Sequence, residues 1–218
     1  MPVRTVPKNH RNVTGAFSST KAVGAARFES TLERDFLALL NFNPAVRSFE
    51  VQPVRIPLSG TDRQRHYTPD VLVHFDPGMM PDRKPWLCEV KYRSELRSDW
   101  KKLTPKFQAA ARFAAEKGWR FKLITEAEIR TPFLENVRFL DRYARLEPGM
   151  EDDVARLHET LAQLREATPA LLLAALCKDR WNQALLLPKL WHMIGTAQVM
   201  ADLTVPLTMQ SSIWLPQD

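Results

Sequence analysis

The sequence predicts an α/β fold in which helices flank a mixed β-sheet, followed by a small C-terminal module that is mainly helical. Segments with apolar residues at alternate positions lie between segments with helical spacing, and the composition changes at Glu147-Pro148-Gly149. At about 150 residues a domain, the 218 residues fit one large domain with a small appendage. We therefore predict an arm over residues 1–27, a main domain over 28–147 and a module over 150–218.

The arm and the first helix differ sharply in their patterns. The first 27 residues are irregular in pattern and hold five Lys and Arg without any acid. A helix is predicted over residues 28–41, because its apolar side chains recur at positions i, i+4, i+8, i+11 and i+12, which form one helical face. The sequence Asn43-Pro44 ends this helix.

The predicted sheet has four strands, at residues 49–57, 65–75, 86–92 and 119–125. The first two are expected to form an antiparallel hairpin around a turn at 59–62, and the nearly continuous apolar run of the third indicates a central position. An Ala-rich helix is predicted over 101–117, with Gly118 at its C-terminal cap. At least one more helix follows within 126–141.

The C-terminal module has the pattern of a winged helix-turn-helix. Thr168-Pro169 is a typical start of a helix. The predicted helices cover 154–164, 168–177, 181–187 and 188–194, and two short strands cover 199–203 and 208–215. The tryptophans of this module are interpreted as core residues; they are Trp181, Trp191 and Trp214.

Composition narrows the class of protein. Residues 1–150 hold 26 Lys and Arg against 17 Asp and Glu, a net charge of +9. Residues 151–218 hold 5 Lys and Arg against 8 Asp and Glu, a net charge of −3, so that the whole chain carries +6. A basic main part with a basic arm is typical of polyanion binders. No HExxH or GxxxxGK(S/T) pattern occurs, which argues against zincin and P-loop chemistry.

The same sequence indicates a cytoplasmic protein. No apolar run approaches the ~20 residues of a membrane span, and residues 1–27 have no apolar stretch of the kind found in secretory signals. The two cysteines, Cys88 and Cys177, form no CxxC pair, which fits a reducing compartment.

The most informative pattern is Pro69-Asp70, followed after 18 residues by Glu89-Val90-Lys91. Residues i and i+2 of a strand point to the same face, so Glu89 and Lys91 project together, and Asp70 comes within reach of Glu89 if the strands pair. Two carboxylates this close repel each other unless a shared proton or a hard cation such as Mg²⁺ offsets their charge.

This arrangement suits metal-dependent hydrolysis of phosphodiesters. A bound Mg²⁺ lowers the pKa of a water ligand and neutralises charge that develops on phosphate. Lys91 would orient or deprotonate the attacking water, or hold a phosphate oxygen. The alternative is a Glu89–Lys91 ion pair on a solvated strand face. Charges that interrupt apolar strands are costly without a partner, which favours a site.

Other charged residues extend the candidate site. Glu29 and Glu33 lie at i and i+4 of the first predicted helix. Glu33 is either a surface residue at the helix edge or a third carboxylate that the helix delivers to the metal site. Four cations that follow the strand of Lys91 either line a phosphate-binding groove or form a solvated helix face; they are Arg97, Lys101, Lys102 and Lys106.

The motifs occur in a fixed order: Ser30-Thr31-Leu32-Glu33, Gln52-Pro53, Tyr67-Thr68-Pro69-Asp70, Glu89-Val90-Lys91 and Leu123-Ile124-Thr125-Glu126. In this order they resemble the TnsA-type endonuclease subunit of heteromeric transposases, which belongs to the restriction-endonuclease-like, PD-(D/E)xK nuclease superfamily. The resemblance covers about residues 28–130. The C-terminal segment resembles the winged-helix module of that family in its predicted topology alone.

The resemblance implies a restriction-endonuclease-like fold and a subunit that cuts the 5′ ends of the transposon in double-stranded DNA. A TnsB-type partner transposase of the DDE class would cut and join the 3′ ends. By position, Glu33, Asp70 and Glu89 would ligate Mg²⁺, for which Mn²⁺ can substitute, and Lys91 would assist the nucleophilic water. The best-known member of the family has Gln at the position of Glu89. Gln52 would either contact the metal ligands and hold them in position, without binding the metal itself, or be an ordinary strand residue.

The resemblance also implies partners for the C-terminal module. In the family this module contacts the transposase and a TnsC-type ATPase regulator. In this chain the module is short and net acidic, so we expect it to contact protein rather than DNA.

Two other functions stay open at this point. A stand-alone restriction or repair nuclease of the same superfamily would cut DNA without a second subunit; the additional module and Glu33 argue against it. A non-catalytic DNA-binding assembly factor on the same fold would have no divalent-metal affinity at Asp70 and Glu89. Acids at three separate motif positions argue against this second alternative.

Overall fold

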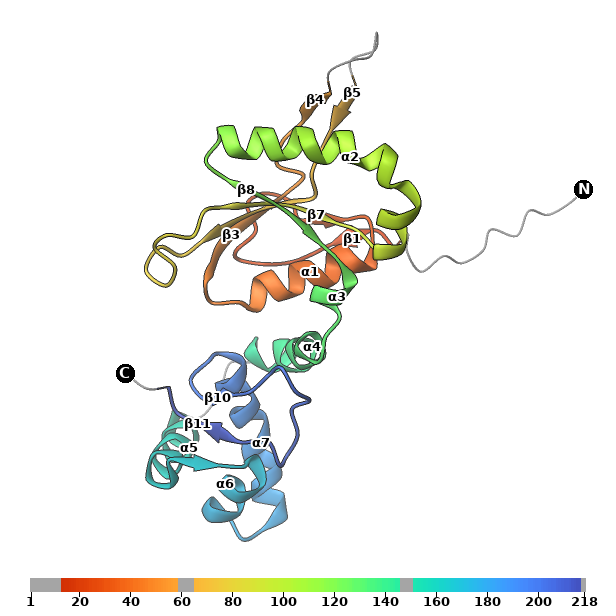
Figure 1. Cartoon of the computed structure of the whole chain (residues 1–218). Helices are drawn as coiled ribbons and strands as arrows, with labels where there is room; N and C mark the ends of the chain where they lie inside the picture. Colours follow the sequence, from red (N-terminus) through yellow and green to blue (C-terminus); the bar gives the residue numbers. More distant parts are fainter. Residues whose placement is uncertain (1–12, 59–64, 146–150, 217–218) are drawn as a thin grey trace, which may run out of the picture. The chain divides into compact units, whose positions relative to one another are not determined.

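The protein is described by a computed structural model that covers residues 13–58, 65–145 and 151–216 (Figure 1). It forms two compact units, Met1–Ile129 and Arg130–Asp218. This division falls before the predicted change of domain at residues 147–149, a segment that lies outside the described residues. The reason is that α4 (Pro132–Ala144) packs on α7 (Arg180–Gly195) of the second unit.

The expected mixed α/β architecture is confirmed in the first unit by a four-stranded sheet of order β3-β6-β7-β8. Its strands are β3 (Val46–Val51), β6 (Val71–Phe75), β7 (Trp86–Val90) and β8 (Arg120–Ile124). The first three pair in antiparallel fashion, whereas β8 runs parallel to β7. Because β7 has a neighbour on each side, the central position predicted from its apolar run is confirmed.

Two helices cover the two faces of this sheet (Figure 1). The helix α2 (Arg93–Glu116) connects β7 to β8, as a parallel pair requires, and its Phe107 and Ala110 bury Leu72 and Leu87 of the sheet. The helix α1 (Thr31–Phe42) packs against β3 and β7. A short helix, α3 (Glu126–Ile129), follows β8 and contacts α1.

The start of the first helix differs from the prediction. It begins at Thr31 because the Ser30 side chain accepts a hydrogen bond from Glu33 N and caps the helix. Phe28 belongs instead to β2 (Arg27–Phe28), which pairs with β1 (Gly15–Ala16). A side chain at Gly15 would meet the Phe28 ring at 2.5 Å, so glycine allows this close approach. The predicted irregular arm therefore contains a short strand pair.

The predicted hairpin is present, but each of its strands is divided in two. Residues 49–57 contain the end of β3 and the start of β4 (Ile56–Leu58), separated at Gln52, whose φ of 51° interrupts an extended strand. Residues 65–75 contain β5 (Arg65–Tyr67) and β6. The strand β4 pairs with β5 and β3 pairs with β6, both antiparallel. The predicted turn at 59–62 lies outside the described residues.

The helix after β7 is longer than predicted. It begins at Arg93, directly after the strand, rather than at Lys101. Glu126 accepts a hydrogen bond from Arg93 N at 2.9 Å and so satisfies one donor of the first turn. Pro105 lies inside the helix. Gly118 follows the helix with a φ of 74°, in agreement with the predicted cap.

The second unit contains α4, α5 (Glu151–Leu164), α6 (Pro169–Leu176) and α7, with a small sheet of order β10-β11-β9. The strands are β9 (Glu166–Ala167), β10 (Met200–Ala201) and β11 (Ile213–Trp214), all paired in antiparallel fashion. The predicted start of α6 is confirmed, because the Thr168 side chain accepts a hydrogen bond from Leu171 N. The winged-helix assignment stays a prediction.

Two details of this unit differ from the predictions. The two helices expected at 181–187 and 188–194 form one helix, α7, which continues through Pro188. Trp191 is buried as expected, but Trp181 is 73% exposed, so the interpretation of Trp181 as a core residue is wrong. Among the described residues, none of the helices has the length and apolar character that crossing a membrane requires.

Candidate active site

Asp70 lies directly before β6, where its backbone is tied to both neighbouring segments. Its N–H donates to Cys88 O at 3.0 Å, and its carbonyl accepts from Gln52 N at 2.8 Å. Its Oδ2 accepts a hydrogen bond from Val90 N at 2.7 Å. The Asp70 carboxylate therefore lies against the carboxyl end of β7, next to Glu89, as strand pairing predicts.

Glu89 is a buried carboxylate with 3% exposure in the inner strand β7. Its Oε2 accepts a hydrogen bond from the Tyr67 hydroxyl at 2.6 Å, and its Oε1 lies 3.3 Å from Lys91 Nζ. The predicted pairing of Glu89 with Lys91 on one face is thus present. The structure brings together Asp70, Glu89 and Lys91.

Tyr67 is a further member of this site, and its contact with Glu89 is not predicted from the sequence pattern. It lies at the end of β5, three residues before Asp70, and is itself buried. The sequence signal was its place in Tyr67-Thr68-Pro69-Asp70, but only the fold shows that its hydroxyl meets Glu89. Burial, together with the charge of Glu89, raises the pKa of Tyr67 far above its usual range, so the hydroxyl stays a hydrogen-bond donor.

The electrostatics of the site are dominated by negative charge. Burial, and then the charge of Glu89, raise the pKa of Asp70 well above its usual range, although Lys91 and the Val90 N–H act in the opposite direction. Burial alone would lower the pKa of Lys91, but the charges of Asp70, Glu89 and Glu33 outweigh burial and raise it. Two carboxyl groups therefore share one ammonium, and a proton on Asp70 or a bound cation would offset the excess negative charge.

The donor set fits a hard divalent cation. Mg²⁺ binds through one or two carboxylates and completes its coordination with water and phosphate oxygens. Oδ1 of Asp70 has no hydrogen-bond partner among the described residues, and the mutual repulsion of Asp70 and Glu89 would be relieved by a cation. Within the ranges that the structure describes, no three His, Cys, Asp or Glu side chains converge as a complete metal site.

Glu33 has a different environment from the two sheet carboxylates. Its Oε2 accepts a hydrogen bond from Glu29 N at 2.8 Å, and its Oε1 accepts from Ser30 Oγ at 2.9 Å. These contacts stabilise the N-terminus of α1 in the manner of a capping box. The charge of Glu33 nevertheless acts on the pKa of both Asp70 and Lys91. Glu33 as a metal ligand stays a prediction.

Gln52 supports the site through its backbone, because its N–H holds the Asp70 carbonyl. Its side chain is exposed and donates from Nε2 to Glu29 Oε1 at 3.1 Å. The side chain therefore contacts the segment before α1 rather than the carboxylates of Asp70 and Glu89. A role for this side chain behind the metal ligands stays a prediction.

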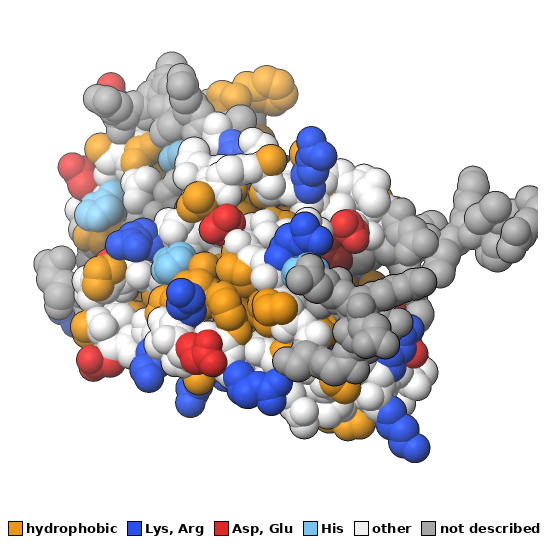
Figure 2. All heavy atoms as spheres, turned by 90° about the horizontal axis from the view of Figure 1, so that it is seen from above, with side chains coloured by type: hydrophobic (Ala, Val, Ile, Leu, Met, Phe, Trp, Pro, Cys, Tyr) orange, Lys and Arg blue, Asp and Glu red, His pale blue; other side chains and the backbone are white. Residues whose placement is uncertain are grey.

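The four predicted DNA-binding cations all lie on α2, but only one lies next to the site. Arg97, Lys101 and Lys102 are exposed. Lys106 is half-buried, and its Nζ lies 6.0 Å from the centroid of the Tyr67 ring. Figure 2 shows the molecule from the side of α2, where Lys and Arg side chains are spread over the surface rather than gathered in one patch.

Comparison with known families covers both units of the chain. A family model described as TnsA-like endonuclease N terminal matches residues 43–126. A second model, described as TnsA endonuclease C terminal, matches residues 128–203. The first match includes Asp70, Glu89 and Lys91 but begins after Glu33. A search of curated proteins finds no match.

Proposed function

The chain belongs to the TnsA endonuclease family and is the endonuclease subunit of a Tn7-like transposase, and we propose that Asp70, Glu89 and Lys91 form its catalytic centre. This centre would hydrolyse the phosphodiester bond at the 5′ ends of the transposon. The observation that carries the proposal is the cluster around the buried Glu89. Glu89 lies 3.3 Å from Lys91, and Asp70 accepts a hydrogen bond from the backbone N–H of Val90, the residue between Glu89 and Lys91.

Asp70 and Glu89 would hold the Mg²⁺ ion, with Mn²⁺ as a substitute and Glu33 as a third ligand. Such an ion lowers the pKa of a bound water and offsets the negative charge that develops on the phosphate. Supporting this assignment, burial and repulsion from Glu89 already raise the pKa of Asp70. For Glu33 to join the ligands, its carboxylate would have to leave Glu29 N and Ser30 Oγ at the start of α1.

Lys91 would act as a hydrogen-bond donor in this centre. Its raised pKa keeps the side chain an ammonium while Asp70 and Glu89 are charged, so it would orient the attacking water or hold a phosphate oxygen. Tyr67 would fix the direction of Glu89. Its bond occupies Oε2, which leaves Oε1, the oxygen near Lys91, on the side where the reaction would occur.

The partners follow from the family. Double-stranded DNA at the transposon ends would be the substrate, a TnsB-type DDE transposase would cut and join the 3′ strands, and a TnsC-type ATPase would regulate the complex. Trp181 and Leu185 of α7, which are 73% and 56% exposed, support protein contact by the second unit. Cys88 and Cys177 are both free thiols, in keeping with a cytoplasmic location.

The proposal is tested by strand-specific cleavage of the transposon's own end DNA in Mg²⁺ or Mn²⁺, with and without the partner transposase. Wild type is expected to cut the 5′ strand when the partner is present, and Glu89→Ala is expected to abolish this cut. Glu116→Ala, which removes an exposed acid near the end of α2, is the matched control and should cut normally.

Other outcomes would favour the alternative functions. Cutting by the wild type without the partner would indicate a self-sufficient nuclease. If the partner cut the 3′ strands while no 5′ cut appeared, the chain would be an assembly factor on a nuclease fold. Full activity of Glu89→Ala would refute the assignment of the catalytic centre.

A further inference from the structure

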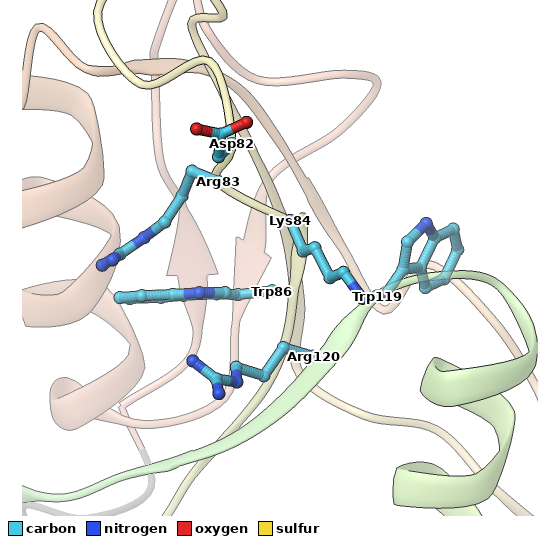
Figure 3. Close-up of a pocket in the computed structure, with 6 residues that line it drawn as sticks. All are labelled: Asp82, Arg83, Lys84, Trp86, Trp119 and Arg120. Carbon is cyan, nitrogen blue, oxygen red and sulfur yellow. The ribbon is translucent and has the colours of Figure 1, made fainter.

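A second charged cluster lies at the opposite end of β7 from Glu89 and Lys91. Six residues line a pocket of about 400 Å³, here named the Trp86 pocket: Asp82, Arg83, Lys84, Trp86, Trp119 and Arg120 (Figure 3). Trp86 begins β7, Arg120 begins β8, and the two are partners in the parallel register. Arg120 N donates to Pro85 O at 2.8 Å, which ties the loop that carries Arg83 and Lys84 to the sheet.

Aromatic rings contact two of the cations in and beside the Trp86 pocket, Arg83 and Lys122. The Arg83 guanidinium carbon lies 4.5 Å from the centroid of the Trp86 ring and 5.4 Å from that of Phe75. Lys122 Nζ, next to the pocket, lies 5.3 Å from the Trp86 centroid. In Figure 3, Arg83 and Arg120 lie on opposite sides of the Trp86 ring. Stacking fixes the plane of a guanidinium and leaves the N–H donors at its edge free.

Among the described residues, these cations have no acidic partners of their own. In the described part of the chain, Arg83, Lys84, Arg120 and Lys122 form no ion pair, whereas Arg145 and Arg156 are each paired with an aspartate. Of the described residues, Asp82 is the one acid that lines the pocket. The lining residues carry three positive charges against one negative charge, and Lys122 adds a positive charge beside the pocket. This excess creates a local positive potential, which an anionic ligand would offset.

The chemistry of the pocket selects the type of anion. The Trp86 ring already has cations against it, so the pocket is not arranged for stacking of a nucleotide base. Its free N–H donors match phosphate oxygens, which guanidinium groups bind through paired hydrogen bonds. Duplex DNA presents one charge per about 1.7 Å of its axis, so a cluster of this kind would meet several phosphates.

We propose that the Trp86 pocket binds backbone phosphates of DNA at a distance from the bond that is cut. Trp86 and Glu89 are three residues apart in β7, so their side chains point to opposite faces and their Cα atoms lie about 10 Å apart. The phosphates at the pocket are therefore not those at Glu89. The proposal rests on the proposed function in one respect, that the substrate of the chain is DNA.

The test is the affinity of the full chain for a fluorescein-labelled DNA duplex, measured by anisotropy over a series of NaCl concentrations without divalent metal. The double variant Arg83→Ala/Arg120→Ala is expected to reduce the slope of log K against log salt by about 2, because each phosphate contact contributes about 0.9. At about 0.1 M salt this corresponds to a roughly 10- to 100-fold loss of affinity.

A matched control removes the same charge elsewhere. Arg145→Ala/Arg156→Ala deletes two arginines that are already paired with Asp141 and Asp153, and should keep the wild-type slope. Arg83→Lys/Arg120→Lys keeps the charge but loses the planar stacking, so it should keep most of the slope and bind more weakly than wild type. A thermal unfolding scan confirms that each variant is folded.

The proposal is overturned if the pocket variant and the control variant have the same affinity and slope. It is also overturned if the pocket variant binds DNA like the wild type but no longer binds the transposase partner, since the pocket would then accept an acidic peptide. Because the assay contains no divalent metal, its result does not depend on whether Asp70 and Glu89 cut DNA, and the two proposals fail independently.

Discussion

The two ends of β7 hold charged side chains in opposite ways. At the carboxyl end, Glu89 is buried, and its two oxygens have protein partners in Tyr67 and Lys91. At the amino end, the Trp86 ring holds Arg83 and Lys122, and no carboxylate of the described residues pairs with either. One end therefore keeps its charges in a fixed geometry suited to chemistry, whereas the other leaves its donors free for a ligand.

This difference predicts two separable functions in one small domain. Changes at the carboxyl end should alter cleavage and metal affinity, because their partners are other catalytic groups. Changes at the amino end should alter the salt dependence of DNA binding. If variants at the carboxyl end of β7 also changed the salt dependence of DNA binding, the two ends would not have separate functions.

The largest effect is expected for Asp70→Ala. Loss of this carboxylate should reduce 5′-strand cleavage by about 1000-fold or more, since a catalytic metal contributes several kcal/mol and each 1.36 kcal/mol is a factor of ten in rate. Single-turnover cleavage with the partner transposase measures it, with Asp99→Ala, on the exposed side of α2, as control. DNA affinity without metal should stay equal or rise; a weaker affinity would mean that the two ends of β7 are not separate.

Lys91→Met is expected to have the next largest effect. Losing a positioned donor should slow cleavage by about 100- to 10,000-fold. Affinity for Mn²⁺ should be unchanged or tighter, because the ammonium that competes with the metal for Glu89 is gone. Titration of bound Mn²⁺ by electron paramagnetic resonance separates the two effects. Weaker metal binding in this variant would assign Lys91 a structural role only.

Tyr67→Phe should produce a smaller change. It removes the 2.6 Å hydrogen bond to Glu89 without changing the ring. Removal of a hydrogen-bond partner of a metal-binding carboxylate typically lowers metal affinity or activity by about 10- to 100-fold. The Mn²⁺ titration and the cleavage assay should both shift by about this factor, and Tyr143→Phe in the second unit should shift neither. Unchanged metal affinity would show that Tyr67 does not hold Glu89 for the metal.

The smallest effect concerns stability. Because the pKa of Asp70 is raised in the folded state, mainly by burial, its ionised form destabilises the protein above the unfolded carboxyl pKa of about 3.9. Asp70→Asn keeps an acceptor for Val90 N and removes the charge. At neutral pH in EDTA it should raise the Tm by about 2–4 °C, or about 1 kcal/mol. At about pH 2.5, well below the unfolded carboxyl pKa of about 3.9, the wild-type carboxyl is almost fully protonated in both states and the difference should vanish. A Tm lower than that of wild type at neutral pH would contradict the destabilising charge.

Glu33 illustrates how one residue supports two interpretations in the sequence. The series Ser30-Thr31-Leu32-Glu33 matches both the family motif and a capping box, S-x-x-E. The structure shows the capping contacts, with Glu33 bound to Glu29 N and Ser30 Oγ. The capping pattern was readable in the sequence, but the distance from α1 to the sheet was not, because it depends on how the helix packs.

Local spacing by itself determined that Glu89 and Lys91 share one face, because side chains alternate along a strand. Asp70 reaches them because β6 pairs with β7, which the sequence pattern left as a condition and the fold supplies. Gly118 as a cap and Thr168 as a helix start are equally local. The apolar run of β7 likewise indicated its inner position, because the centre of a sheet that helices cover on both faces is buried on both sides.

The tertiary structure alone decided what surrounds that core. Tyr67 reaches Glu89 because β5 and β7 approach in space, 22 residues apart in the chain. The Trp86 pocket exists because the parallel register places Arg120 beside Trp86, after a crossover through the whole of α2. Such long-range contacts depend on the packing of the helices on the sheet, whereas the sequence pattern specifies only which face of each element is apolar.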